Sequence, residues 1–234
     1  EIDNLSVLSA LEQTAGRGQR GNKWTSNAGE NLMFSVVLKF SPEYSGLGGL
    51  DARDQFILNE IAALTVVDFL RSHGIHAQIK WPNDIYVGSR KICGILIENS
   101  LRGNRLSSSI IGIGLNINQR NFDVNLPNPT SMALCTSGSY DIRKCLDEFM
   151  TIFTAYLERY LNITGGYLKL RKMYLSQLWR KDIEAVFIDY TTLPTGHLEG
   201  PMNIRPQNAP DSDIPPHINP QDQPGNVFPG IIRG

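Results

Sequence analysis

The sequence predicts an α+β fold in which a mixed β-sheet is backed by helices. Helical periodicity is confined to a few long stretches, and most of the strand-like apolar runs between them are separated only by short turns. A doubly wound parallel sheet would instead need a crossover helix between successive strands. We therefore expect helices packed against a sheet whose strands are mostly joined by hairpins.

The first expected strand covers residues 32–38, an apolar and partly β-branched run between Gly29 and Pro42. A helix is expected from Asp51 to Arg71, because apolar residues recur there at steps of three and four, and Gly74 follows as a stop. The remaining expected elements are strands at 77–80, 84–87, 91–98 and 109–115, a hairpin turn at 88–90, and helices at 141–161 and from after Gly166 to about Trp179.

The composition changes near Thr191, where proline becomes frequent. Nine of the 13 prolines lie between Pro194 and Pro229, interleaved with Asn, Asp, Gln and Gly. Proline has no backbone N–H and cannot continue a helix or a central strand, and this segment has little apolar surface to bury. We therefore expect one domain at residues 1–182 and an irregular or disordered segment at 183–234.

Charge and cysteine usage exclude several classes of function. The 22 basic and 23 acidic side chains leave a net charge of −1, so no global field attracts nucleic acid or an anionic membrane. No apolar run reaches the ~20 residues of a membrane span and no secretion signal is recognisable, so a cytoplasmic location is expected. The three cysteines and four histidines form no C-x-x-C or H-E-x-x-H pattern, so we expect no metal site.

A glycine-rich loop at Gly16–Gly21 fits the G-x-G-x-x-G spacing of dinucleotide-binding turns. Such a turn must open a helix, but a turn-rich stretch and then a strand follow here, and no Gly-Lys-Ser/Thr ending marks a Walker loop. The loop keeps three glycines and the cations Arg17, Arg20 and Lys23, a composition suited to close approach to an anion. A solvated surface turn remains the alternative.

Three further segments carry residues of interest. Lys80-Trp81-Pro82-Asn83-Asp84 is a rigid, polar turn between two expected strands, which also fits a simple capped loop. In the segment 90–98, Lys91 stands at the mouth of an apolar strand, either as a solvated edge or as a point charge for a carboxylate or phosphate. In the segment 111–118, glycines alternate with apolar residues and leave one sheet face bare, as a closely approaching ligand requires.

The four segments QTAGRGQRG-x-x-W, KWPND, RKICGILIE and GIGLNIN, in this order, closely resemble the biotin protein ligases. The resemblance is detailed over residues 8–120 and extends in outline to Asp182. It implies a catalytic domain, and because no helix-turn-helix pattern is recognisable before it, no DNA partner is expected. The implied reaction joins biotin to ATP as biotinyl-5′-AMP with Mg²⁺, and then transfers biotin to a lysine of a biotin carboxyl-carrier protein; no tightly bound prosthetic group is expected.

The resemblance also implies roles for single residues. Lys91 matches the lysine that bridges the biotin carboxyl group and the α-phosphate, Arg17 matches a loop residue at these anions, and Asp84 matches a carboxylate near the incoming carrier lysine. These three are the expected catalytic residues. The expected biotin-binding residues are Gln13, Gly16, Arg17, Gly18, Gln19, Lys91, Gly94 and Gly112, and those for ATP or adenylate are Arg17, Arg20, Trp24, Asn83, Lys91 and Asn116.

The chain also departs from the family pattern. Gln19 stands where many members have a phosphate-binding arginine, the usual Ser-Thr-Asn stretch before the glycine loop is not recognisable, and neither is the usual C-terminal β-barrel. A module that binds biotin or adenylate, or docks the carrier without turnover, is therefore one alternative. A lipoate-type ligase is another, and the sequence does not decide between a monomer and a homodimer.

Overall fold

The structure is a computed structural model that describes residues 2–40, 50–161, 166–189 and 226–231. The chain separates into two compact units, Glu1–Trp179 and Arg180–Gly234. The first unit contains the sheet and the long helices, and the second contains one pair of short strands.

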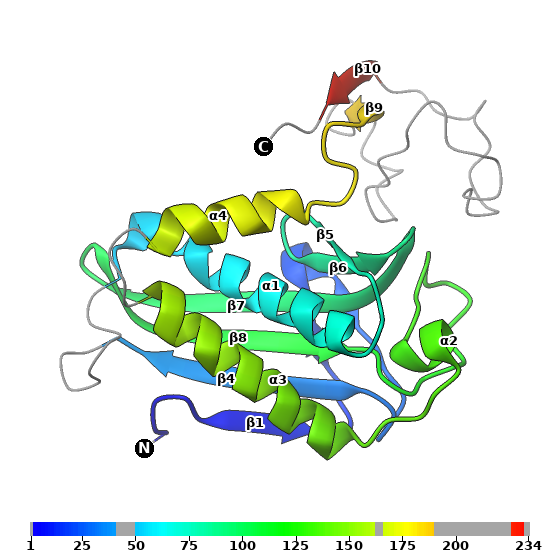
Figure 1. Ribbon diagram of the computed structural model, residues 1–234, viewed down its shortest axis with the longest axis horizontal. Coiled ribbons are helices and arrows are strands. Elements are labelled where there is room, and N and C mark those ends of the chain that lie inside the picture. The colour runs from blue at the N-terminus through cyan, green and yellow to red at the C-terminus, as the bar shows by residue number, and fades with distance from the viewer. Residues whose placement is uncertain (1, 41–49, 162–165, 190–225, 232–234) are drawn as a thin grey trace. The chain divides into compact units, whose positions relative to one another are not determined.

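The first unit is built on a six-stranded sheet with the order β1-β4-β8-β7-β6-β5 (Figure 1). Neighbouring strands in this sheet all pair antiparallel, so the mixed sheet that we expected is an antiparallel one. Parallel pairing is seen in two isolated bridges, Ile79 with Leu178 and Lys91 with Pro129. The strands are β1 (Val7–Ala10), β4 (Leu32–Lys39), β5 (Gln78–Lys80), β6 (Asp84–Val87), β7 (Arg90–Arg102) and β8 (Arg105–Leu115).

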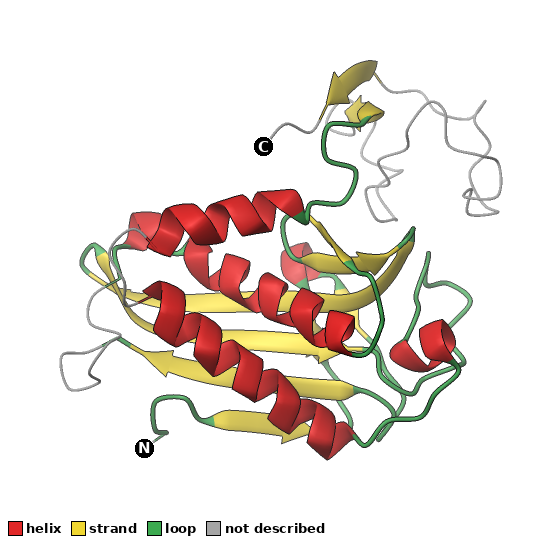
Figure 2. Ribbon diagram, viewed as in Figure 1, coloured by secondary structure: helices red, strands yellow, loops and turns green. Residues whose placement is uncertain are grey.

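Three long helices lie together on one face of this sheet (Figure 2). The central one, α1 (Phe56–Ser72), lies between α3 (Ile142–Tyr156) and α4 (Gly166–Ser176). Of the 17 residues of α1, 13 are buried, as expected for a helix enclosed by a sheet and two further helices. Short helical turns complete the unit: η1 (Gln19–Gly21), η2 (Ala52–Asp54), α2 (Met132–Thr136) and η3 (Leu157–Leu161).

The strands divide their side chains between two faces. Alternate residues of β4 and β8, among them Phe34 and Ile113, join the core under the helices. There the rings of Phe34 and Phe149 meet edge to face with centroids 5.1 Å apart. The residues between them, including Gly112 and Gly114 of β8, face the opposite side of the sheet, so the bare face predicted from the glycine pattern is the one away from the long helices.

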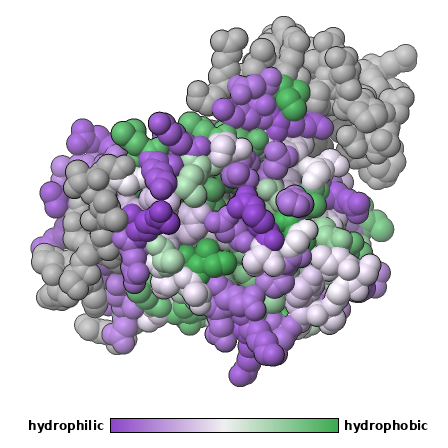
Figure 3. Space-filling model, viewed as in Figure 1, coloured by the Kyte–Doolittle hydropathy of each residue, from purple (hydrophilic) through white to green (hydrophobic). Residues whose placement is uncertain are grey.

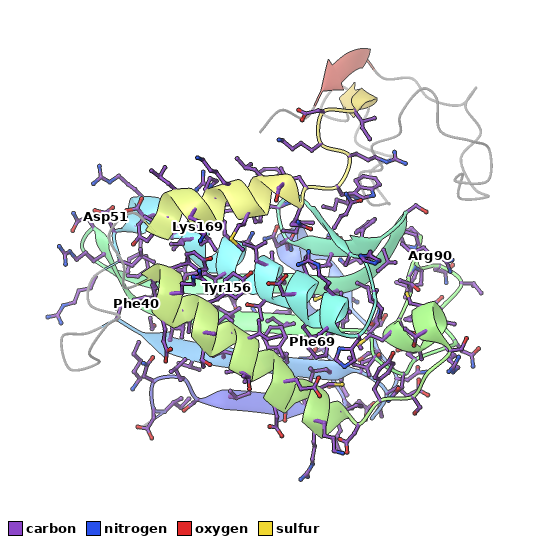
Figure 4. All side chains as sticks on the ribbon, in the orientation of Figure 1. Phe40, Asp51, Phe69, Arg90, Tyr156 and Lys169 are labelled. Atoms are coloured by element: carbon purple, nitrogen blue, oxygen red, sulfur yellow. The ribbon has the colours of Figure 1, made fainter. Side chains whose placement is uncertain are left out.

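The helix layer is held together by polar as well as apolar contacts. Phe69 of α1 and Tyr156 of α3 lie between these helices (Figure 4), and the Tyr156 hydroxyl donates to Asp68 at 2.7 Å. Burial and this carboxylate raise the pKa of Tyr156. On the outer surface of the helix layer, hydrophilic residues are interspersed with small groups of apolar ones (Figure 3). This pattern agrees with the amphipathic periodicity from which α3 was predicted.

The elements differ from expectation mainly where they are exposed. All four residues of β1 are exposed, and this edge strand was not predicted because one-sided burial is the signal on which strand prediction depends. The hairpin of β7 and β8 extends beyond the predicted strands, to Arg102 and from Arg105. The expected helix at 141–161 ends as an α-helix at Tyr156 and continues as a π-helical turn.

The second unit corrects part of the expectation for residues 183–234. Strands β9 (Glu184–Asp189) and β10 (Asn226–Ile231) pair antiparallel, where we expected irregular structure. Pro229 lies within β10, which a two-stranded ladder tolerates because each strand has a free edge. Residues 190–225 and 232–234 of the expected irregular segment lie outside the described residues.

Candidate active site

The glycine-rich loop folds as a small hairpin. Strands β2 (Gly16–Arg17) and β3 (Lys23–Trp24) pair antiparallel around the turn η1. Gly16 must lack a side chain, because a Cβ atom there would collide with the carbonyl oxygen of Trp24. Gly21 adopts a φ of +82°, in the left-handed region that glycine favours. No α-helix begins within or directly after this loop, so it lacks the helix N-terminus on which a dinucleotide-binding turn depends.

A cavity of about 970 Å³ lies between this loop and strand β7. The strand contributes Leu96, Ile97 and Glu98, and the remaining lining residues come from residues 13–26. Six of the predicted ligand-binding residues are therefore brought together here. They are Gln13, Gly16, Arg17, Gly18, Gln19 and Trp24.

The indole of Trp24 lies on a floor made by two glycines. Gly94 of β7 and Gly114 of β8 are directly paired, and they leave that part of the sheet without side chains. A Cβ atom on Gly114 would approach Trp24 Cε2 to 2.5 Å, and one on Gly94 would lie 3.3 Å from Trp24 Cζ3. The Trp24 indole nitrogen is buried without a hydrogen-bond partner among the described residues.

Gly114 was not among the predicted site residues, although it shares a face with Gly112 and could have been found from that alternation. At Gly112, which we did predict, an added Cβ atom would meet its nearest neighbour, the carbonyl oxygen of Leu96, at an ordinary 3.4 Å. A side chain at Gly114 would therefore displace Trp24, whereas one at Gly112 would not.

Lys91 and Asp84 form an ion pair beside this floor. Lys91 Nζ lies 2.7 Å from Asp84 Oδ1, and the side chains are 33% and 23% exposed. The same ammonium lies 6.0 Å from the centre of the Trp24 ring. An added Cβ atom on Gly94 would be 3.4 Å from Lys91 Nζ, so the lysine extends over the bare backbone of that glycine. The structure thus brings together Lys91 and Asp84, which were predicted to be catalytic, and Gly94, which was predicted to bind biotin.

A β-bulge is what turns Lys91 toward Gly94. These residues are three apart, and regular alternation would place them on opposite faces of β7. The register against β6 shifts, so that Cys93 pairs with Ile85 and Lys91 with Tyr86, leaving Ile92 as the extra residue. Ile92 and Cys93 are both fully buried in the core, and Lys91 returns to the face of Gly94.

Arg17, the second cation expected to be catalytic, pairs with an acid from the sheet. Arg17 Nη2 lies 3.0 Å from Glu98 Oε2, and the two side chains are 72% and 47% exposed. Glu98 lines the same cavity and was not predicted as a site residue. The side chain of Arg20 lies outside the described residues.

The two predicted asparagines take part in the framework of the site. Asn83 Nδ2 donates to the carbonyl of Ile95 at 2.7 Å, which fixes the turn before β6 against β7. Asn116 is 5% exposed and its Nδ2 donates to the carbonyl of Thr130 at 2.9 Å. Both side chains therefore have a structural role here, and contacts of either with a nucleotide stay a prediction.

A buried amide pair joins the residue before β4 to the segment after β8. Asn31 and Gln119, 2% and 4% exposed, bond through their side chains. Gln119 Oε1 also accepts from Asn27 N at 3.2 Å, and Asn31 Oδ1 accepts from Ile117 N at 3.1 Å. Neither residue was predicted, since isolated polar residues give no pattern until tertiary contacts pair them.

Comparison with known proteins shows which family this domain resembles. Residues 1–116 match the biotin/lipoate A/B protein ligase family. A biotin protein ligase from Aquifex aeolicus, solved with biotin and ATP, superimposes with a TM-score of 0.65 at 26% identity, over 81% of this chain and 75% of that one. These matches support a biotin protein ligase catalytic domain in this chain. The resemblance read from the four motifs, and the α+β fold with its helix-backed sheet, are thereby confirmed.

Curated biotin protein ligases show the same similarity. The bifunctional ligase/repressor BirA of Bacillus subtilis is 38% identical over 116 residues, which are 49% of this chain and 33% of that protein. The biotin–[acetyl-CoA-carboxylase] ligase of Paracoccus denitrificans is 35% identical over 119 residues, which are 50% of this chain and 46% of that protein. The matched region thus spans a third to a half of these biotin protein ligases.

Two searches of the described residues bear on membrane and metal binding. No helix among them has both the length and the apolar character needed to cross a membrane. They also contain no group of three or more His, Cys, Asp and Glu side chains arranged to hold a metal ion.

Proposed function

We propose that this chain carries the activity of a biotin protein ligase, activating biotin with ATP as biotinyl-5′-AMP and passing it to a lysine of a carrier domain. The observation that carries the proposal is the position of Lys91. Its ammonium lies over the bare backbone of Gly94, next to Asp84 and the Trp24 ring. A cation held at a surface without side chains suits a reaction that brings two anionic groups together.

In the first step, a carboxylate oxygen of biotin attacks the α-phosphorus of ATP. A new P–O bond forms, the bond from that phosphorus to the oxygen bridging toward the β-phosphate breaks, and pyrophosphate leaves. We assign Lys91 to offset the repulsion between carboxylate and phosphate, which a fixed ammonium does without reorganising during the reaction. Arg17 and the backbone N–H of Gly16 would act on the same anions from the loop side of the cavity, whereas the Gly18 N–H donates to the carbonyl of Asn22 at 2.7 Å.

In the second step, the amine of a carrier lysine attacks the carbonyl carbon of the mixed anhydride. A C–N bond forms, the C–O bond to the phosphate breaks, and AMP leaves. Asp84 is the carboxylate beside Lys91. Once Lys91 engages the phosphate, Asp84 can orient the incoming ammonium and accept the proton that its nitrogen must lose.

The resemblance also implies Mg²⁺, which would offset triphosphate charge. The two carboxylates described at this site, Asp84 and Glu98, are each paired with a cation, and no three-ligand cluster is found among the described residues. Mg²⁺ commonly binds through substrate phosphates and water with few protein ligands. The described residues offer no ligand set of their own for the ion, so phosphate oxygens and water would be its main ligands.

Mass spectrometry tests this function directly. The chain is incubated with biotin, Mg²⁺ and ATP and a biotin carboxyl-carrier domain, and a gain of one biotinyl group on one carrier lysine is expected. The Lys91→Ala variant should lose the gain together with pyrophosphate release. Lys169→Ala, an exposed change on α4 (Figure 4), serves as the control and should keep both.

The alternatives give different results in the same experiment. Binding of biotin without any mass gain would favour a non-catalytic module, and modification with lipoate but not biotin would favour a lipoate-type ligase. Normal turnover by Lys91→Ala would contradict the role of that lysine. The cytoplasmic location and a biotin carboxyl-carrier protein as partner stay predictions from the sequence, which leaves the choice between a monomer and a homodimer open.

A further inference from the structure

The cavity that would bind a carboxylate and phosphates contains a carboxylate of its own. Glu98 lies on β7 and lines the cavity together with Leu96. An acid at this place would repel an anionic ligand, which makes it an unexpected residue in such a site. Its position is explained by its partner, because Glu98 Oε2 accepts from Arg17 Nη2 at 3.0 Å.

This pair joins the loop to the sheet across the cavity. Arg17 belongs to the glycine loop hairpin, and Glu98 lies 81 residues further along the chain in the central strand β7. Since the side chains are 72% and 47% exposed, water screens their attraction. An anion that enters the cavity can therefore replace Glu98 as the partner of Arg17, and only a small interaction energy is lost.

We infer that Glu98 holds Arg17 in the ligand-free protein and is replaced there by the anionic group of the ligand. Glu98 is then a positioning residue: it keeps the glycine loop against β7 until a carboxylate or phosphate arrives, and its own charge weakens the binding of that anion. The inference rests on the proposed function for the nature of the ligand, but the contact between Arg17 and Glu98 can be tested without any ligand.

The binding experiment compares biotin with its uncharged methyl ester by calorimetry. The Glu98→Gln variant should bind biotin about two- to fivefold more tightly than the unchanged chain, as expected for removing an exposed ion pair that the ligand must break. The methyl ester should bind equally to both. Glu158→Gln removes the same charge from an exposed position in η3 and should leave both affinities unchanged.

A double-mutant cycle then separates the ion pair from simple repulsion. In an Arg17→Gln background, Glu98→Gln should change biotin affinity less than in the unchanged chain, because the pair is already broken. An equal gain in both backgrounds would mean that Glu98 acts by repulsion alone and would overturn the inference. Unchanged or weaker biotin binding by the single variant Glu98→Gln would overturn it as well.

Limited trypsin digestion tests the contact in the absence of ligand. If Glu98 restrains the loop, cleavage after the basic residues of the loop should be several-fold faster in Glu98→Gln than in Glu158→Gln. Equal cleavage rates would refute the restraint whatever the ligand is. Faster cleavage with no binding of biotin or its ester would instead support the restraint and count against the proposed function.

Discussion

Lys91 and Asp84 lie 2.7 Å apart on neighbouring strands, joined by an ion pair at the edge of a floor made of glycine backbone. Asp84 stands directly opposite Gly94, and the bulge at Ile92 turns Lys91 to the same face. The pair therefore places a cation and an acid side by side, and under the proposed function biotin, ATP and a carrier lysine would meet there.

We expect the Asp84→Asn variant to form adenylate at least about tenfold more slowly, because losing one charge-assisted hydrogen bond frees the Lys91 side chain. The rate of pyrophosphate release in a single turnover measures this step. Transfer to the carrier should fall further, since the carboxylate near the incoming amine is lost as well. If adenylate formation stayed normal while transfer alone fell, Asp84 would serve only the second step.

Gly114→Ala should displace Trp24, because the added methyl group would lie 2.5 Å from its Cε2 atom. We expect a loss of about 1–3 kcal/mol in the free energy of unfolding, typical of overpacking, and a shift of the Trp24 indole N–H signal in NMR spectra. Gly112→Ala is the matched control on the same face and should leave that signal in place. Equal shifts in both variants would argue against the direct contact.

Gln119→Leu should lower the free energy of unfolding by about 1–3 kcal/mol, since the buried Asn31 Nδ2 and the partly buried Asn27 N would lose their acceptor. Urea denaturation measures the difference. Asn125→Ala, an exposed amide near the same segment, should change it by no more than about 0.5 kcal/mol. A loss of similar size in both variants would show that the buried Asn31–Gln119 pair contributes no more to the free energy of unfolding than an exposed amide does.

The buried carboxyl group of Glu60 should make the stability of the fold depend on pH. It is 1% exposed and pairs with Arg171, and burial raises the pKa of its carboxyl group more than Arg171 lowers it. A raised folded-state pKa means that the contribution of Glu60 is present below its unfolded pKa of about 4.3 and is lost as the pH rises through the folded value.

The Glu60→Gln variant cannot titrate at this position. Its free energy of unfolding, minus that of the unchanged chain, should therefore increase between about pH 4 and about pH 7. Urea denaturation across this range measures the difference, with exposed Glu158→Gln as a control whose difference stays flat. A flat difference for Glu60→Gln would refute the raised pKa.

The three cysteines should differ in reactivity. Cys135 is exposed, whereas Cys93 and Cys145 are buried, and burial raises the pKa of Cys145 to about 11. A thiol reagent at about pH 8 should label Cys135 rapidly in the folded chain and all three cysteines after unfolding. Mass spectrometry of the labelled peptides would show the difference, and rapid labelling of Cys93 would contradict its place in the core.

Sequence patterns predicted the elements best where burial continues along a whole segment. The apolar periodicity at 51–71 predicted α1, and the apolar run at 32–38 predicted β4, because continuous burial leaves a continuous signal. The edge strand β1 and the paired strands β9 and β10 gave no such signal and were missed. Four motifs in order were enough to recognise the family, since each constrains several adjacent residues.

The sequence by itself predicted the fold class, the resemblance to biotin protein ligases and the segments proposed to carry the site. The tertiary structure alone decided which residues within those segments face one another. The bulge that turns Lys91 over Gly94, the seat of Trp24 on Gly114 and the pairing of Arg17 with Glu98 each depend on strand register or on contacts between distant segments. Local patterns carry no information on such contacts, because a shift of one residue exchanges the two faces of a strand.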